Sequence, residues 1–164
     1  MAHSFNFTDV HVSNDDGRVK IRMDLDMERF EKQYTRAQFL LDSEVMTCMI
    51  PYMPMITGTF INVTKAMSAA IAGSGYVYAA APPYGRFLYK GKTMVGPTGS
   101  TWARYGEKKV LVSQYAGKTN AREDLQYTDE FHPRVGAEWF ELAKKRYGRA
   151  WIQNAKARAG DGRK

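Results

Sequence analysis

The segment PPYGRFLYKGK, residues 82–92, decides how the middle of the chain can be arranged, because it carries signals for both ends of a short helix. Pro83 suits the first turn of a helix, where the missing N–H of proline costs no hydrogen bond. Gly91 stands where a helix end favours a residue that tolerates positive φ. The segment therefore predicts a helix of one to two turns.

The spacing of side chains gives this short helix two different faces. Tyr84, Phe87 and Leu88 follow the i, i+3, i+4 pattern of one face, which we expect to point inward. The other face carries Arg86, Tyr89 and Lys90. This basic, tyrosine-bearing face is either a contact surface or the solvated side of a connecting helix.

Length and composition indicate one domain with an ordinary core, since the chain has 164 residues and is 44% hydrophobic. No apolar run of about 18 residues is present, so we expect no membrane span. The first residues lack the basic and apolar regions of a secretory signal. A single cysteine, Cys48, excludes an internal disulfide and a cysteine-based metal site, and favours folding in a reducing cytoplasm.

The N-terminal region predicts a β-hairpin over residues 5–25. Its strands, 5–12 and 18–25, alternate apolar and polar residues on either side of the turn sequence Asn14-Asp15-Asp16-Gly17. A helix over 27–50 follows, with Asp24 or Asp26 as its expected cap. Its apolar stripe consists of Phe30, Tyr34, Ala37, Leu41, Val45, Cys48 and Tyr52.

The middle of the chain predicts two further strands and a long arm. Residues 58–64 and 75–81 are apolar and bounded by turn residues, so we expect an antiparallel pair of strands there. Residues 66–72 are compatible with strand, helical turn or loop. The region 93–122 is rich in loop residues and contains one expected strand, 108–115. Such a long loop is usually functional or disordered, and we expect it to order against a neighbouring subunit.

The last helix is expected over residues 133–158, with Pro133 in its first turn. Residues 134–164 hold nine lysines or arginines and three acidic residues, so this region carries +6 of the net charge of +7. The outer face of the helix carries Lys144, Lys145, Arg146 and Arg149. These cations favour an anionic neighbour, nucleic acid or an acidic protein surface, although a solvated helix face explains them as well.

Taken together, these elements predict an α+β fold. A small, mostly antiparallel sheet of five strands would pack against the apolar stripes of the two long helices, and the loop-rich arm would extend from it.

The titratable residues do not form a pattern typical of an enzyme or a metal site. His3 and His11 lie far from His132, and no ligand spacing is present. Asp129 and Glu130 lie next to His132, where a helix cap is the commoner explanation. The sequence lacks the nucleophile elbow of hydrolases and the ending of a phosphate loop. We therefore expect no enzyme activity, no metal and no cofactor.

Three stretches carry a resemblance to a known family. They are the helix exit PYMPMITG at 51–58, the segment 82–92, and residues 132–145 with their Trp139-Phe140 pair. In this order they resemble the minor capsid proteins of long-tailed bacteriophages and, more distantly, the neck or tail-completion proteins of lambda-like siphophages. Gly85 departs from the alanine usual in that family, and the region 93–122 matches poorly.

The resemblance implies a structural virion protein without enzyme activity. It would be assembled in the host cytoplasm and form a ring around the DNA channel at the head–tail junction, a hexamer rather than a dodecamer. Its partners would be copies of itself and adjacent neck and tail proteins, with no membrane contact. The expected subunit interface uses Arg86, Tyr89, Lys90, Trp102 and Tyr105. The expected contact with DNA or another anion uses Lys144, Lys145, Arg146 and Arg149.

Three alternatives remain open from the sequence. A small basic nucleic-acid-binding module would bind duplex DNA as a monomer, with steep salt dependence. An enzyme would have to use Asp129, Glu130 and His132. Another capsid or tail role is also compatible, although a tail-tube protein would show longer alternating strands.

Overall fold

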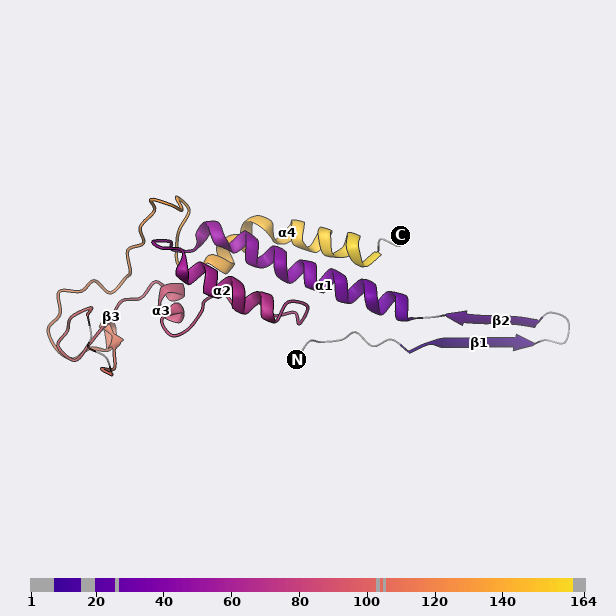
Figure 1. The fold of residues 1–164 in the computed structure, drawn as a ribbon, viewed down its shortest axis with the longest axis horizontal. Coiled ribbons are helices and arrows are strands. Elements are labelled where there is room, and N and C mark those ends of the chain that lie inside the picture. Colours follow the sequence, from indigo (N-terminus) through magenta and orange to yellow (C-terminus); the bar gives the residue numbers. More distant parts are fainter. Residues whose placement is uncertain (1–7, 16–19, 26, 103, 105, 161–164) are drawn as a thin grey trace.

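The structure is a computed structural model that describes residues 8–15, 20–25, 27–102, 104 and 106–160. Figure 1 shows an elongated molecule with a β-hairpin at one end, helices in the middle and a loop-rich arm at the other end. The elements in chain order are β1 (Val10–Asp15), β2 (Lys20–Leu25), α1 (Glu28–Met49), α2 (Thr59–Ala70), α3 (Gly85–Lys90), β3 (Met94–Val95), β4 (Val110–Leu111) and α4 (Trp139–Gly160), with 3-10 helices at Ile50–Tyr52 and Val112–Gln114. The predicted α+β class and its two long helices are confirmed.

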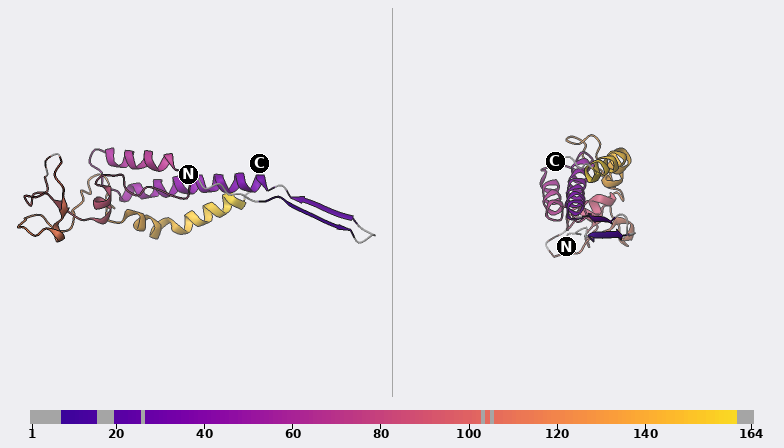
Figure 2. Two further views of the ribbon diagram at one scale, coloured as in Figure 1. Left: turned by 90° about the horizontal axis from the view of Figure 1, so that it is seen from below. Right: turned by 90° about the vertical axis from the view of Figure 1, so that its right-hand side faces the viewer.

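The two long helices form the body of the molecule. Figure 2 shows α1 lying between α2 and α4. The core gathers around the C-terminal half of α1, where Val45, Met46 and Met49 pack with Trp139 and Trp151 of α4. The N-terminal half of α1 contributes less, because its predicted core residues Phe30 and Tyr34 are 43% and 40% exposed.

The cap of α1 and the start of α4 differ from the prediction. Met27 is the N-cap residue of α1, and its N–H donates to the carboxylate of Asp9 over 2.9 Å. Asp24 belongs to β2, and Asp26 lies outside the described residues. The last helix begins at Trp139 and not at Pro133. Glu138, with a φ of 53°, breaks the helical path just before it. This left-handed conformation is uncommon for a residue with a side chain, and it separates the turn from the helix.

The predicted N-terminal hairpin is present, but its first strand spans Val10–Asp15 and not 5–12, and the described part of its second strand is Lys20–Leu25. Asn14 and Asp15 of the predicted turn lie in the first strand, opposite Ile21 and Lys20, and residues 5–7 and 16–19 lie outside the described residues. β1 and β2 pair antiparallel, with Val10 opposite Leu25 and Val12 opposite Met23. The expectation that this hairpin joins one five-stranded sheet packed on the helices is wrong. The described residues form two separate two-stranded sheets, β1–β2 and β3–β4. In Figures 1 and 2 the hairpin projects beyond the end of α1, away from the helices.

The predicted strand 58–64 is part of helix α2, and the ambiguous residues 66–72 continue that helix to Ala70. The β-branched residues of this stretch favour a strand, yet Ile61, Thr64 and Ser68 are spaced to share one helical face. All three are buried. Packing against α1 therefore overrides the local preference, a common outcome for short segments.

The predicted strand 75–81 is an irregular segment with bends, and it pairs with no strand of the described structure. Its backbone is bound by hydroxyl groups of α2 instead. The Ser68 hydroxyl accepts from the Tyr78 N–H and donates to the Tyr78 carbonyl, each over 3.1 Å. The Thr64 hydroxyl accepts from the Ala81 N–H over 3.1 Å. These side-chain bonds satisfy backbone groups that a sheet would otherwise pair.

The short helix α3 is confirmed, but it begins at Gly85 with Tyr84 as its N-cap residue, so Pro83 precedes the helix and does not lie in its first turn. Gly91 is its C-cap residue, with a φ of 65°. Gly85 is the first residue of the helix and packs closely against residue Ala80. A Cβ added at Gly85 would lie 2.9 Å from the carbonyl carbon of Ala80. That separation is shorter than real Cβ contacts, so a residue with a side chain would force the backbone to move. The inward placement of Tyr84 is wrong, since this side chain is 54% exposed.

The arm that begins after α3 contains little regular structure. Met94–Val95 pairs with Val110–Leu111, so the predicted strand 108–115 is reduced to two residues followed by a 3-10 turn. The chain returns beside the end of α3, where the Leu125 N–H donates to the Gly91 carbonyl over 2.8 Å. Lys92 reinforces this return through an ion pair with Asp124 at 2.6 Å.

Candidate functional site

A groove with a volume of about 1260 Å³ runs over the described surface, and we call it the basic groove. It lies between α1, residues 75–79 and α4. Its floor is apolar and consists of Leu41, Val45, Met49, Val77 and Trp151. An apolar floor of this size at the molecular surface marks a candidate binding site.

The rim of the groove is positively charged along α4. All four predicted anion-contact residues, Lys144, Lys145, Arg146 and Arg149, are exposed there and line the groove. Lys156 extends the same rim. The described part of α4 places one carboxylate near the start of this row, Glu141, at 3.7 Å from Lys144. The structure therefore brings the predicted cations together beside an apolar floor that the sequence analysis did not identify.

One wall of the groove is held by a buried carboxylate. Asp42 is only 4% exposed and accepts from the N–H groups of Gly73 and Gly75 over 2.8 and 3.1 Å. Its second oxygen accepts from the Gln38 amide over 2.7 Å. These bonds fix the turn before residues 75–79 onto α1. An acidic residue within the apolar side of a predicted helix was the signal for this role, and the sequence analysis missed it.

The Trp151 indole forms part of the groove and has an unpaired polar atom. The side chain is 6% exposed, and its Nε1 has no hydrogen-bond partner among the described residues. A buried donor without an acceptor costs about 1–3 kcal/mol. A ligand that supplied an acceptor to this N–H would remove that cost.

The predicted interface face of α3 is only partly exposed. Tyr89 does not point outward, because its ring packs edge-on against Trp139 with 4.9 Å between ring centroids. Burial raises the pKa of Tyr89, and the carboxylates of Glu141 and Glu138 raise it further. Lys90 is exposed but pairs with Glu138 at 2.7 Å, and this hydrogen bond raises the pKa of Lys90. Arg86 is exposed, with its guanidinium 4.9 Å from the centre of the Phe87 ring.

The arm presents a tryptophan to solvent. Trp102 is 85% exposed, and its backbone N–H donates to the Ser100 hydroxyl over 3.1 Å. Tyr105, the other predicted interface residue of the arm, lies outside the described residues. Lys109 donates to the Thr101 carbonyl over 2.5 Å, which links two sides of the loop around Trp102.

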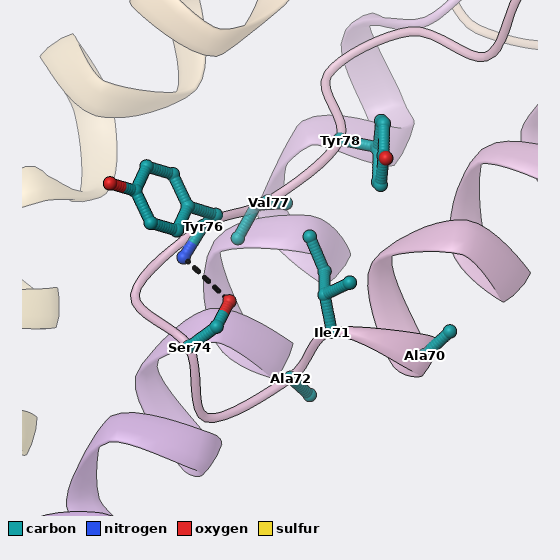
Figure 3. Close-up of a pocket in the computed structure, with 7 residues that line it drawn as sticks. All are labelled: Ala70, Ile71, Ala72, Ser74, Tyr76, Val77 and Tyr78. Atoms are coloured by element: carbon teal, nitrogen blue, oxygen red, sulfur yellow. Dashed lines mark hydrogen bonds between the residues drawn. The ribbon is translucent and has the colours of Figure 1, made fainter. Parts of the chain in front are cut away.

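A smaller hollow of about 480 Å³ lies after α2, as Figure 3 shows. Its lining includes Ile71, Ser74 and Tyr76, and the Ser74 hydroxyl accepts from the Tyr76 N–H over 3.3 Å. The described residues that line this hollow include no acidic, basic or histidine side chain.

The residues Asp129, Glu130 and His132 are not arranged as a metal site in the described structure. His132 places Nδ1 2.7 Å from the Met53 carbonyl, so the ring ties the turn before α4 to the end of α1. No group of three or more histidine, cysteine or acidic side chains in the described part of the chain is arranged to hold a metal. Over the same residues, no helix is both long and apolar enough to cross a bilayer.

Comparison with protein-family models, curated proteins and solved structures found no match for this chain.

Proposed function

We propose that this protein is a structural, non-enzymatic component of a tailed-phage virion that forms a ring around the DNA channel at the head–tail junction. The proposal starts from the three sequence stretches that resemble minor capsid and neck proteins of long-tailed phages. Its immediate partners would be copies of itself, the adjacent neck and tail proteins and, through the row of cations on α4, the DNA that passes through the ring.

The observation that carries the proposal is the large surface of the isolated chain. Its accessible surface is 12377 Å², whereas a compact monomer of 18.6 kDa is expected to expose about 8200 Å². The excess of roughly 4200 Å² is comparable to the area that obligate oligomers bury. A chain that exposes this much surface is expected to bury part of it against other subunits.

The positions of the extensions also support a ring. The hairpin and the arm lie at opposite ends of the molecule (Figure 1), and each exposes apolar side chains, Val10 and Val12 on β1 and Trp102 in the arm. Rings of identical chains use two different surfaces on each subunit, which meet head to tail and close by rotation. Two separate contact regions are what such an interface requires.

The test is to locate the protein in particles of the phage that encodes it. Antibody labelling and electron microscopy of virions are expected to place it at the vertex where head and tail join. A label on the capsid faces or along the tail would contradict the proposal. Native mass spectrometry of the purified protein adds the stoichiometry, and a hexamer would have a mass of about 112 kDa.

A nucleic-acid-binding module remains the second candidate, because Lys144, Lys145, Arg146 and Arg149 form one exposed row. This function predicts duplex binding by the monomer that weakens steeply as salt rises. Replacing the four cations with glutamine would then abolish binding. If the monomer does not bind duplex DNA at about 50 mM salt, this candidate fails.

A further inference from the structure

We infer that the arm, residues 93–122, carries a second DNA contact, in which a hollow between residues 98–101 and 118–121 binds a phosphate of the DNA backbone. This inference goes beyond the proposed function, which assigns the DNA contact to α4. Three features of the arm support it: its charge, the lining of the hollow and the bonds that shape the hollow.

The arm is positively charged, in contrast to most of the chain. Residues 93–122 contain five basic residues and one acidic residue, a net charge of +4. Residues 1–92 and 123–133 contain ten basic and thirteen acidic residues, a net charge of −3. The five cations of the arm are all exposed, and they are Arg104, Lys108, Lys109, Lys118 and Arg122. Such a concentration of one sign of charge favours a polyanionic partner.

The carboxylates in and beside the arm bind other groups. Glu107, the acidic residue of the arm, accepts from the backbone N–H of Arg104 over 2.9 Å. Just beyond the arm, Asp124 and Glu123 pair with Lys92 at 2.6 and 3.6 Å. Among the described residues, none of the five cations of the arm forms an ion pair. Their charges are therefore available to a ligand.

The hollow offers hydrogen-bond donors to an anion. It has a volume of about 540 Å³, and its described lining includes Lys118 and no acidic side chain. The Ser100 hydroxyl accepts from the Trp102 N–H over 3.1 Å, and its own hydrogen can still donate. The other polar side chains of the lining are Thr98, Thr101, Thr119 and Asn120. Lysine, serine, threonine and asparagine are common partners of DNA phosphates.

Hydrogen bonds across the arm shape the hollow. The Thr119 hydroxyl donates to the Gly99 carbonyl over 2.6 Å. The Tyr115 hydroxyl donates to the Pro97 carbonyl over 2.9 Å. Gly99 has a φ of 77°, and a Cβ added there would lie 2.6 Å from the Lys118 carbonyl oxygen. The two sides of the hollow can approach this closely because residue 99 is a glycine. A site that is formed in advance loses less conformational entropy when it binds.

The positions of the cations favour a polymer over a free phosphate ion. Lys118 lines the hollow, whereas the other four cations of the arm do not line it. A DNA backbone presents phosphates at regular intervals, so one phosphate can enter the hollow while its neighbours meet the cations outside it.

The experiment measures binding of the full-length protein to a dye-labelled DNA duplex of about 20 base pairs, by fluorescence anisotropy between about 50 and 200 mM salt. The arm variant carries Lys108→Gln, Lys118→Gln and Arg122→Gln. It is expected to bind more weakly and to lower the salt slope of log K by about 2–3, since each phosphate contact contributes about 0.9 to that slope.

The matched control loses the same amount of charge outside the arm and outside α4. It carries three exposed cations of α1 and α2 replaced by glutamine, namely Lys32, Arg36 and Lys65. The control is expected to keep the affinity and the salt slope of the unchanged protein. This comparison separates contacts made by the arm from an effect of net charge.

A further variant, Gly99→Ala, changes the hollow without changing any charge. The added Cβ would collide with the Lys118 carbonyl, so DNA binding is expected to weaken several-fold. A protein with glutamine at the four predicted cations of α4 is expected to keep the contribution of the arm. Adding Lys118→Gln to that protein should weaken its binding again.

Four outcomes would overturn the inference: no duplex binding at about 50 mM salt, an unaltered salt slope in the arm variant, unaltered binding by Gly99→Ala, or loss of all binding when only the α4 cations are replaced. Poly-L-glutamate that binds as tightly as DNA, with the same dependence on Lys118, would also overturn it and indicate an acidic protein partner. These measurements use the purified protein, so they are independent of where the protein lies in a virion and test the inference separately from the proposed function.

Discussion

Two tryptophans show how differently the two parts of this molecule use the same side chain. Trp139, at the start of α4, has no exposed surface, and its indole N–H donates to the Ala79 carbonyl over 2.7 Å. Its ring also meets Phe60 of α2 edge-on, at 5.9 Å. Trp102 in the arm is 85% exposed. The first holds the subunit together, whereas the second provides apolar surface that the isolated subunit leaves in water.

This contrast separates stability from assembly. The residues around Trp139 join helices and an extended segment that are far apart in the sequence. Changes there should lower the free energy of unfolding. Changes in the hairpin and the arm should leave that free energy almost unaltered, and should act on the association of subunits instead.

The largest effect is expected for Trp139→Ala. Removing a fully buried indole costs about 3–5 kcal/mol of unfolding free energy and leaves a cavity between three helices. Trp139→Phe keeps an aromatic ring but removes the donor to Ala79, which should cost about 1–3 kcal/mol. Urea denaturation followed by circular dichroism measures both. A Trp139→Ala protein within about 1 kcal/mol of the unchanged chain would contradict this view of the core.

A smaller loss is expected for Asp42→Ala. The substitution leaves the N–H groups of Gly73 and Gly75 without their charged acceptor, at a cost of roughly 2–3 kcal/mol. The control is Asp124→Ala, which removes an exposed partner of Lys92 and should leave stability almost unchanged, because water screens this ion pair. Equal losses for both, measured by urea denaturation, would show that burial of Asp42 does not matter.

Tyr127 predicts a loss of stability at high pH. Its hydroxyl donates to the Leu88 carbonyl, and burial raises its pKa from 10.0 to about 12. Because the folded state holds this proton more tightly, the stabilisation is complete below pH 10.0 and is lost as the pH rises towards about 12. Tyr127→Phe should remove this part of the pH dependence. Urea midpoints at several pH values would test it, and identical slopes for both proteins would contradict it.

The smallest effect on stability is expected for Trp102→Ala. An exposed side chain with few neighbours should change the free energy of unfolding by no more than about 0.5 kcal/mol. If the arm contacts another subunit, the same change should weaken self-association several-fold, because exposed aromatic residues often anchor interfaces. Sedimentation velocity measures the association. If Trp102→Ala instead lowered the free energy of unfolding and left association unchanged, Trp102 would act in the fold and not in assembly, which would contradict the contrast with Trp139.

The local patterns of the sequence were sufficient where short-range chemistry decides the structure. The alternating residues and turn signals of the N-terminal region predicted the hairpin, although Asn14 and Asp15 belong to its first strand, and Gly91 predicted the end of α3. The stripe of α1 was recognised, although Phe30 and Tyr34 are more exposed than predicted. The exposed cations on α4 were also predicted, because they stand outside the apolar stripe of the helix.

The same reasoning failed where a distant segment supplies the hydrogen bonds. Thr64 and Ser68 looked like residues of a strand and of an undecided segment, but both are buried hydroxyls on α2 that bind residues 78–81. The basic groove was not predicted either, because Asp42 and Trp151 belong to different helices. Their common site exists only after α1 and α4 have packed.

By itself, the sequence determined the two long helices, the hairpin, the short capped helix and the uneven distribution of charge. Each of these depends on spacing, caps or turn residues within a few positions of one another. Only the tertiary structure decided that α2 is a helix, that residues 75–81 pair with hydroxyl groups and that the hairpin lies apart from the helical body. The physical reason is that burial and long-range hydrogen bonds outweigh weak local preferences, and both depend on which segments meet in space.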